Sequence, residues 1–168
     1  LVQIFKNYFP DKQIQDEIAR KLDEFEASMD FTPYPGVLDF ILDLKKEGIK
    51  TAIATSSNRP KFSHLKSRCP EFVALFDRIL TAEDFSASKP DPDCYLKAAA
   101  ALGCTKDECA VFEDAFTGLQ AGMASGMLTV GLTTTNSREA IEGKCHYILD
   151  SWVGFTTDSL RKLLRSAL

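Results

Sequence analysis

Short apolar segments alternate with longer amphipathic segments along most of this sequence. The apolar segments are three to seven residues long and lie at 49–55, 78–80, 109–114, 128–132 and 146–150. The first of them, IKTAIAT, is almost continuously apolar, which is typical of a parallel strand that is buried on both faces. Strands that alternate with helices form right-handed βαβ units. The sequence therefore predicts an α/β fold with a doubly wound parallel sheet.

The segments between these strands have the pattern of amphipathic helices. We expect helices at 12–29, 37–48, 59–69, 93–102, 116–126 and 158–168. The apolar residues of the first helix recur at helical spacing among charges: Ile14, Ile18, Leu22 and Phe25. Such a stripe covers a partner surface with one face of the helix. The turn sequence PYPG follows at 33–36, so we expect a boundary that separates residues 1–32 from residues 33–168.

Composition excludes several classes of protein. With 168 residues, 45% of them hydrophobic, the chain is long enough for a compact domain with a real core. Lysine and arginine number 20 against 24 acidic residues, which gives a net charge of −4, and basic residues form no block. We therefore expect no nucleic-acid partner and no membrane partner. Five scattered cysteines without a CxxC pair, and only two histidines, argue against a zinc site. We expect a monomeric cytoplasmic protein with reduced thiols.

Polar side chains follow three of the predicted strands at the point where each strand ends or the next helix begins. Hydroxyl residues occupy 55–57 after the first strand, Lys89 precedes a Pro-Asp-Pro turn, and Glu113 and Asp114 come directly off the third strand. Ligands of open α/β sheets collect beyond the carboxyl ends of the strands. A hydroxyl and a lysine neutralise phosphate oxygens, and paired carboxylates hold Mg²⁺. This set therefore indicates a metal-assisted phosphoryl site.

Each of these features also has a purely structural interpretation. The segment 55–58 is suited to capping the helix that follows it. Glu113 and Asp114 lie just before another predicted helix and are suited to the same role. Lys89, taken alone, is compatible with an ordinary solvent-exposed lysine. Only the order and spacing of the three features favour the functional interpretation over the structural one.

Three segments resemble the second, third and fourth motifs of the haloacid dehalogenase-like hydrolases. They are AIATSSN, SKPDPDCYLKAA and VFEDAFTGLQAGMASGM. The resemblance extends over about residues 31–135 and is strongest to the β-phosphoglucomutase-like phosphatases, which have a helical cap. By this resemblance, residues 1–32 are the last part of the cap, and the rest is the α/β core.

The resemblance implies a role for each site residue. Thr55 would grip a phosphate through its hydroxyl, with the Ser56 amide beside it. Lys89 would contact the nucleophile and the transferred phosphoryl group. Asp114, together with Glu113, would hold the Mg²⁺ cofactor.

The first motif of the family, a strand followed by Asp-x-Asp-Gly, is missing from this sequence. The one Asp-x-Asp present is Asp91-Pro-Asp93, inside the third motif. In the family, the first-motif strand carries the nucleophilic aspartate and lies between the strands that end here at Thr55 and Asp114. We expect the nucleophile to lie upstream of Leu1 and the chain by itself to be inactive. The alternative is a pseudoenzyme with a rearranged sheet.

The resemblance therefore implies a Mg²⁺-dependent phosphatase that acts on a small phosphorylated metabolite, such as a sugar phosphate, through a phospho-aspartyl intermediate. A phosphosugar mutase of the same family and an inactive phosphate-binding or partner-binding fragment are the alternatives. The family's mutases place a cation late in the cap, whereas residues 26–30 contain no lysine or arginine. This difference favours the phosphatase.

Overall fold

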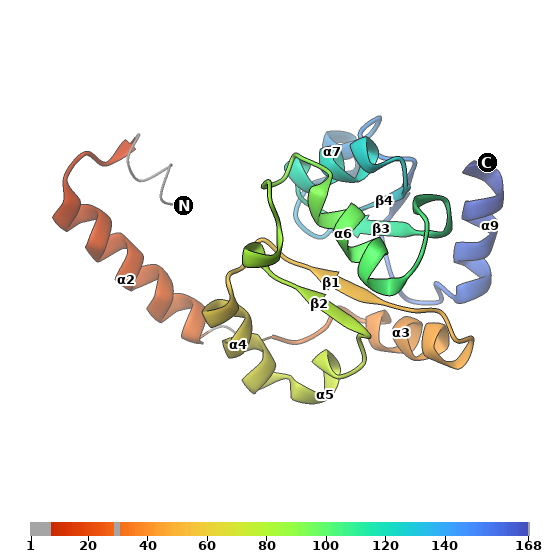
Figure 1. Ribbon diagram of the computed structural model, residues 1–168, viewed down its shortest axis with the longest axis horizontal. Helices are drawn as coiled ribbons and strands as arrows, with labels where there is room; N and C mark the ends of the chain where they lie inside the picture. Colours follow the sequence, from red (N-terminus) through yellow and green to blue (C-terminus); the bar gives the residue numbers. More distant parts are fainter. Residues whose placement is uncertain (1–7, 29–30, 168) are drawn as a thin grey trace. The chain divides into compact units, whose positions relative to one another are not determined.

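Parallel strands and the helices between them form most of the chain (Figure 1). The computed structural model describes residues 8–28 and 31–167, and the chain divides into two compact units, Leu1–Thr32 and Pro33–Leu168. The strands of the described part all lie in the second unit: β1 (Ala52–Ala54), β2 (Arg78–Leu80), β3 (Ala110–Glu113), β4 (Leu128–Leu132) and β5 (Tyr147–Leu149). They pair in parallel. The predicted α/β class with parallel strands is confirmed. That residues 1–32 belong to a cap stays a prediction.

The parallel strands are divided between two hydrogen-bonded sheets. One contains β1 and β2, and the other has the strand order β3-β4-β5. Among the described residues, no strand pairing joins β1 to β3. The break falls where the resemblance places the first-motif strand. It also leaves the wholly apolar strand β1 only half-buried, at Ala52, Ile53 and Ala54.

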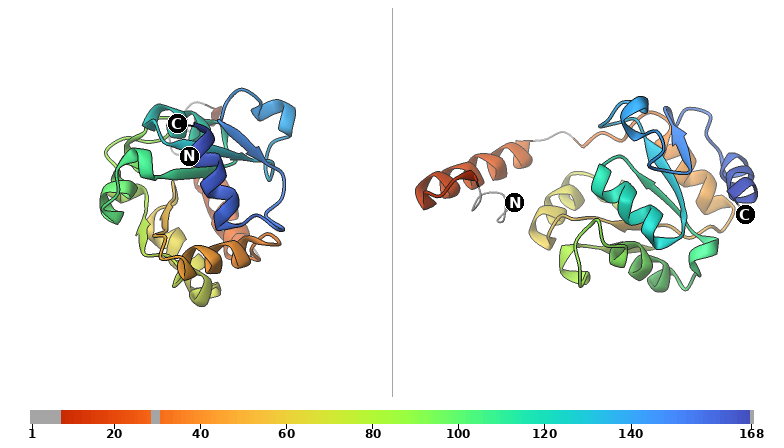
Figure 2. Two further views of the ribbon diagram at one scale, coloured as in Figure 1. Left: turned by 90° about the vertical axis from the view of Figure 1, so that its right-hand side faces the viewer. Right: turned by 90° about the horizontal axis from the view of Figure 1, so that it is seen from above.

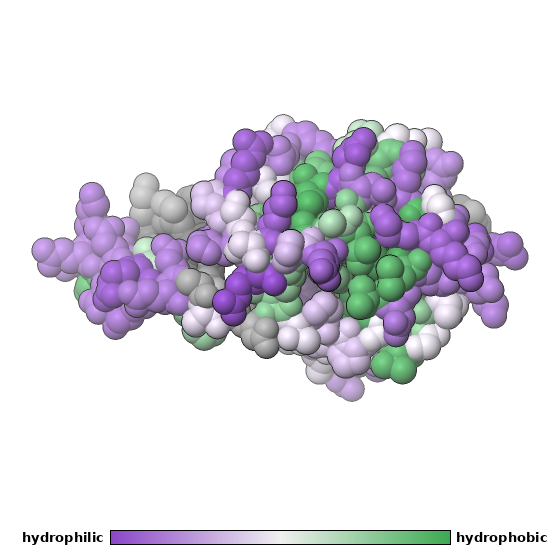
Figure 3. All heavy atoms as spheres, turned by 90° about the horizontal axis from the view of Figure 1, so that it is seen from below, coloured by the Kyte–Doolittle hydropathy of each residue, from purple (hydrophilic) through white to green (hydrophobic). Residues whose placement is uncertain are grey.

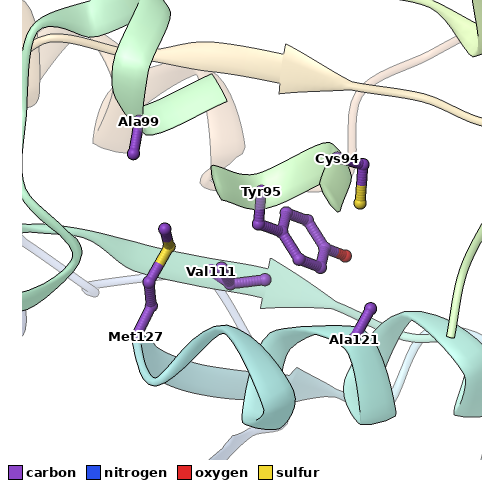
Figure 4. Close-up of a cluster of buried hydrophobic side chains, with 6 residues drawn as sticks. All are labelled: Cys94, Tyr95, Ala99, Val111, Ala121 and Met127. Atoms are coloured by element: carbon purple, nitrogen blue, oxygen red, sulfur yellow. The ribbon is translucent and has the colours of Figure 1, made fainter. Parts of the chain in front are cut away.

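Helices α6 (Asp93–Leu102) and α7 (Phe116–Ser125) cover one side of both sheets. Helix α6 packs against β1, β2 and α7, and α7 packs against β3 and β4. The shared core contains side chains from α6, β3 and α7 and from the turn before β4: Cys94, Tyr95, Ala99, Val111, Ala121 and Met127 (Figure 4). These two helices therefore connect the two sheets without a hydrogen bond between strands.

A second core lies under helices α3 (Val37–Lys46) and α9 (Thr157–Ala167), which contact each other (Figure 2). Its buried members come from α3, β4 and α9: Phe40, Leu44, Leu128, Val130 and Leu160. Aromatic rings extend it, with the Phe40 ring centroid 5.7 Å from that of Phe112 and 5.0 Å from that of Phe155. Aromatic pairs at such distances add stability beyond the area they bury.

The remaining helices are α2 (Lys12–Ser28), α4 (Arg59–Arg68), α5 (Pro70–Val73) and α8 (Arg138–Ile141), with short 3₁₀ turns η1 (Ala82–Asp84) and η2 (Lys106–Glu108). The long helices start and end within two residues of their predicted limits, and the last residue of the expected 158–168 helix lies outside the described part. Two helices, α5 and α8, were not expected, because four residues are too few to show a helical period.

Apolar side chains also reach the surface, as the view from below shows (Figure 3). Leu38 and Leu42, one turn apart on α3, are each about half exposed.

Across the described residues, no helix combines the length and the hydropathy that a bilayer crossing demands.

Candidate active site

Lys89 links the carboxyl ends of the two sheets. Its ammonium nitrogen lies 2.7 Å from Oε2 of Glu113, the last residue of β3. The same nitrogen lies 3.5 Å from the backbone oxygen of Ala54, the last residue of β1. The Lys89 side chain is only 13% exposed, so the interpretation as a solvent-exposed lysine is wrong.

Glu113 is held by four donors. Its Oε2 accepts hydrogen bonds from Lys89 and from the Tyr95 hydroxyl, each at 2.7 Å. Its Oε1 accepts from the backbone amides of Asp114 and Ala115, each at 3.0 Å. Burial alone would raise the pKa of this carboxyl, but the hydrogen bond and charge of Lys89, helped by the amide and phenol donors, lower it to about 2. The carboxylate is therefore ionised and fixed. It also satisfies two backbone amides ahead of α7, but α7 has no side-chain cap hydrogen bond at its N-terminus, so the interpretation of Glu113 and Asp114 as helix caps is wrong.

Two residues that sequence reasoning missed complete the surroundings of Glu113. Tyr95 is buried, and its hydroxyl points toward the carboxyl end of β3 (Figure 4). The Lys89 nitrogen lies 4.8 Å from the centroid of the Tyr95 ring, within reach of a cation–π interaction. Gly118 leaves the space that the carboxylate occupies, since a Cβ there would lie 2.1 Å from Cδ of Glu113. Neither residue lies at a strand end, and the sequence pattern indicated only polar residues at strand ends.

Asp114 is positioned by the loop that follows β4. Its Oδ2 accepts hydrogen bonds from the hydroxyls of Thr134, at 3.0 Å, and Thr135. Its backbone oxygen accepts from the Asn136 side-chain amide at 2.7 Å. This loop was not predicted as part of the site, although the sequence TTTN directly after a predicted strand is a signal of the same kind as the hydroxyls after β1.

Thr55 and Ser56 follow β1, next to the backbone oxygen that Lys89 contacts. The Thr55 hydroxyl oxygen accepts a hydrogen bond from the Ser57 amide at 3.1 Å, so its own proton stays available for donation. Asn58, not Thr55, caps helix α4 with its side chain. The capping interpretation is therefore right for Asn58 and leaves the Thr55 hydroxyl for another partner.

The two acidic side chains differ in what they can still bind. Both oxygens of Glu113 are occupied by donors of the protein, whereas the hydrogen bonds recorded to the Asp114 carboxylate in the described part all reach Oδ2. An open carboxylate oxygen suits a hard cation such as Mg²⁺. No group of three or more acidic, histidine or cysteine side chains forms a complete metal cage within the described residues. Asp114 therefore fits one position of a magnesium site, and the role of Glu113 as a second ligand stays a prediction.

Comparison with known proteins places this geometry in context. The family model of the haloacid dehalogenase-like hydrolases matches residues 3–126. The validoxylamine A 7'-phosphate phosphatase of Streptomyces hygroscopicus subsp. limoneus is 30% identical over 75% of this chain and 60% of its own length. The β-phosphoglucomutase of Bacillus subtilis (strain 168) is 38% identical over 58% of this chain and 42% of its own length. The chain thus spans about half the length of these curated relatives.

A solved structure has the same fold over nearly the whole chain. A HAD hydrolase of family IA, variant 3, from Entamoeba histolytica HM-1:IMSS matches with a TM-score of 0.83. The alignment covers 98% of this chain and 77% of that one, at 22% sequence identity. At this identity the match supports the fold alone.

Proposed function

Because this chain belongs to the haloacid dehalogenase-like hydrolases, with a validoxylamine A 7'-phosphate phosphatase, a hexitol phosphatase and a β-phosphoglucomutase among its relatives, we propose that it forms the phosphate-binding and magnesium-binding part of a phosphatase. The substrate would be a small phosphorylated metabolite. The observation that carries the proposal is the buried position of Lys89 between the ends of β1 and β3.

Lys89 and Thr55 would bind the phosphoryl group. An ammonium group has three N–H donors, and the contacts with Glu113 and the Ala54 oxygen use two of them. The third donor and the Thr55 hydroxyl, with the Ser56 amide, would then neutralise phosphoryl oxygens as negative charge builds up in the transition state. Glu113 keeps the ammonium at this point and prevents it from turning into solvent.

Asp114 would hold the magnesium ion through Oδ1, with Glu113 as the predicted second ligand. When bound, the ion supplies positive charge to the phosphoryl oxygens and orients the group for transfer. The donors on Oδ2 keep the Asp114 carboxylate in one orientation, so binding a cation requires little rearrangement of the protein.

We further propose that the nucleophilic aspartate comes from a strand that pairs with β1 and β3. This is supported by the separation of these strands into two sheets and by the incomplete burial of β1. Buried backbone groups without partners cost about 1–3 kcal/mol each, so a strand between them would stabilise the fold as well as complete the site.

A phosphosugar mutase is the second candidate, favoured by the 38% identity to the β-phosphoglucomutase of Bacillus subtilis. The lack of a lysine or arginine in residues 26–30 favours the phosphatase, although residues 29 and 30 lie outside the described part. An inactive protein that binds phosphate or a partner is the third candidate. Release of inorganic phosphate without interconversion of glucose 1-phosphate and glucose 6-phosphate would support the phosphatase.

The test uses the protein as the cell produces it, with p-nitrophenyl phosphate as a generic phosphomonoester. We expect phosphate release that requires Mg²⁺ and falls by roughly 10²-fold or more in Lys89→Ala and in Asp114→Ala. Lys97→Ala removes a partly exposed lysine of α6 that pairs with Asp93, and should keep near-normal activity. Undiminished activity in both site variants would reject the proposal, and absence of turnover with retained phosphate binding would favour the third candidate.

A further inference from the structure

The loop after β4 makes an unusual set of contacts with Asp114. Thr134 and Thr135 both donate their hydroxyl protons to one oxygen, Oδ2. Asn136 donates to the backbone oxygen of the same residue. Three consecutive side chains, about 20 residues away in the sequence, thus contact a single aspartate.

These contacts select one orientation of the carboxylate. Rotation about the last side-chain bond of aspartate is soft and roughly two-fold, so an unrestrained carboxylate at a strand end samples a range of orientations. Two hydroxyl donors on Oδ2 remove that freedom for Asp114. They also leave Oδ1 as the oxygen that has no recorded donor in the described part of the chain.

The charge of Asp114 also lacks a protein partner. Glu113, its neighbour, is paired with Lys89 at 2.7 Å. No ion pair of Asp114 is recorded among the described residues. A half-buried carboxylate that is fixed by neutral donors but not neutralised by a cation is the arrangement that a metal ligand needs.

The neighbouring residue Thr133 fixes the loop through a contact that does not involve Asp114. Thr133 donates to Oδ1 of Asp150 at 3.2 Å, and Asp150 is also paired with Arg138. One end of the loop is therefore attached to the structure away from Asp114. Thr133 consequently provides a matched control: the same residue type in the same loop, bonded to a different aspartate.

We infer that Thr134 and Thr135 are positioning residues that set the affinity of Asp114 for magnesium, an inference that rests on the proposed function. Their role would be to hold Oδ2 of Asp114 rather than to bind the ion themselves. Loss of such outer hydrogen bonds to a metal-binding carboxylate typically weakens metal affinity by about 10–100-fold. The expected effect is therefore on metal binding itself and is measurable without substrate.

The experiment is a calorimetric titration of the protein, as the cell produces it, with MgCl₂ in the absence of substrate. We expect the Kd of the Thr134→Val/Thr135→Val variant to rise by about 10–100-fold. The Thr134→Ser/Thr135→Ser variant keeps both hydroxyls and should bind within a few-fold of the wild type, as should Thr133→Val. A purely structural role would instead lower the fraction of molecules that bind and leave the Kd unchanged.

Two outcomes separate this inference from the proposed function. Asp114→Ala should abolish Mg²⁺ binding. If it does, but the Thr134→Val/Thr135→Val variant binds Mg²⁺ like the wild type, the inference is wrong and the proposed metal site stands. If Asp114→Ala binds like the wild type, or the wild type binds no Mg²⁺, the metal site fails and the inference with it. Should the valine pair not fold, Thr134→Val and Thr135→Val are titrated singly, and wild-type affinity in both overturns the inference.

Discussion

Lys89 and Glu113 form an ion pair between residues 24 positions apart, with 2.7 Å between the ammonium nitrogen and Oε2. The two side chains are 13% and 11% exposed, so little water is present to replace either partner. Removing one member of such a pair leaves a buried charge without compensation. The stability of the fold therefore depends on the same two side chains that we propose for phosphate and metal binding.

Replacing Lys89 by methionine should destabilise the protein. We expect Lys89→Met to lower the free energy of unfolding by about 3–5 kcal/mol, because the Glu113 carboxylate stays buried without its cation. The double variant Lys89→Met/Glu113→Gln should recover much of this loss, since neither partner is then charged. Urea unfolding at pH 7 measures the free energy of unfolding of the single and the double variant. Lys97→Met breaks a pair that is more accessible to solvent, with side chains 36% and 22% exposed, and should cost much less; an equal loss in Lys89→Met and Lys97→Met would contradict the prediction.

The stability of the protein should depend on pH through Glu113. Its pKa falls from an ordinary 4.5 to about 2 in the folded state, so the ionised form stabilises the fold. This contribution is fully present above pH 4.5 and is lost as the pH falls toward 2, and the shift corresponds to roughly 3 kcal/mol. The measurement is the difference in unfolding free energy between the wild type and Glu113→Gln, with a chelator present. We expect that difference to shrink between pH 5 and pH 2; a constant difference would show that ionisation of Glu113 does not stabilise the fold.

Removing the Tyr95 hydroxyl should also destabilise the protein, but by less than Lys89→Met does. Tyr95→Phe keeps the buried ring and its contact with Lys89 but loses the 2.7 Å hydrogen bond to Glu113. Hydrogen bonds to a charged group contribute about 1.5–3 kcal/mol, and we expect a loss in that range by urea unfolding. Tyr147 is 45% exposed, so Tyr147→Phe is the control. Equal stabilities of the two variants would argue against the hydrogen bond.

A methyl group at position 118 should displace the Glu113 carboxylate. In an unobstructed helix, glycine to alanine stabilises by about 0.5–1 kcal/mol. In Gly118→Ala, the new Cβ would lie 2.1 Å from Cδ of Glu113, and overpacking of this kind costs about 1–3 kcal/mol. We expect a net loss of stability by thermal unfolding, together with lower phosphatase activity.

The control for this variant is Gln120→Ala, an exposed position of the same helix, which should change stability by less than about 0.5 kcal/mol. If Gly118→Ala proves more stable than the wild type, the carboxylate does not need this space.

Local features of the sequence predicted the elements of the fold closely. The strands 78–80 and 128–132 and the helix 93–102 have the bounds that local composition and turn residues predict. Helix α7 ends before Gly126, which takes a left-handed conformation at φ +74°, as a glycine after a helix commonly does. These features depend on neighbouring residues, so the sequence contains all the information needed to place them. The four-residue helices α5 and α8 were not predicted, because four residues make about one helical turn and are too few for a hydrophobic period to repeat.

The sequence also predicted Thr55, Lys89 and Asp114 as candidate site residues, because polar residues at strand ends can be recognised without knowing which strands are neighbours. The partners that orient them could not be found in this way. Tyr95 lies 18 residues from Glu113, and Thr134 lies 20 residues from Asp114. Their spacing in the chain has no relation to their distance in space.

The sequence by itself thus determined the type and approximate limits of most elements and supplied the candidate residues at the strand ends. Only the tertiary structure decided that Glu113 binds Lys89, that Asp114 is oriented by the loop after β4, and that the strands separate into two sheets between β1 and β3. The physical reason is that helix period and strand hydrophobicity arise from residues a few positions apart. Which carboxylate meets which donor depends instead on how distant segments pack around a shared core.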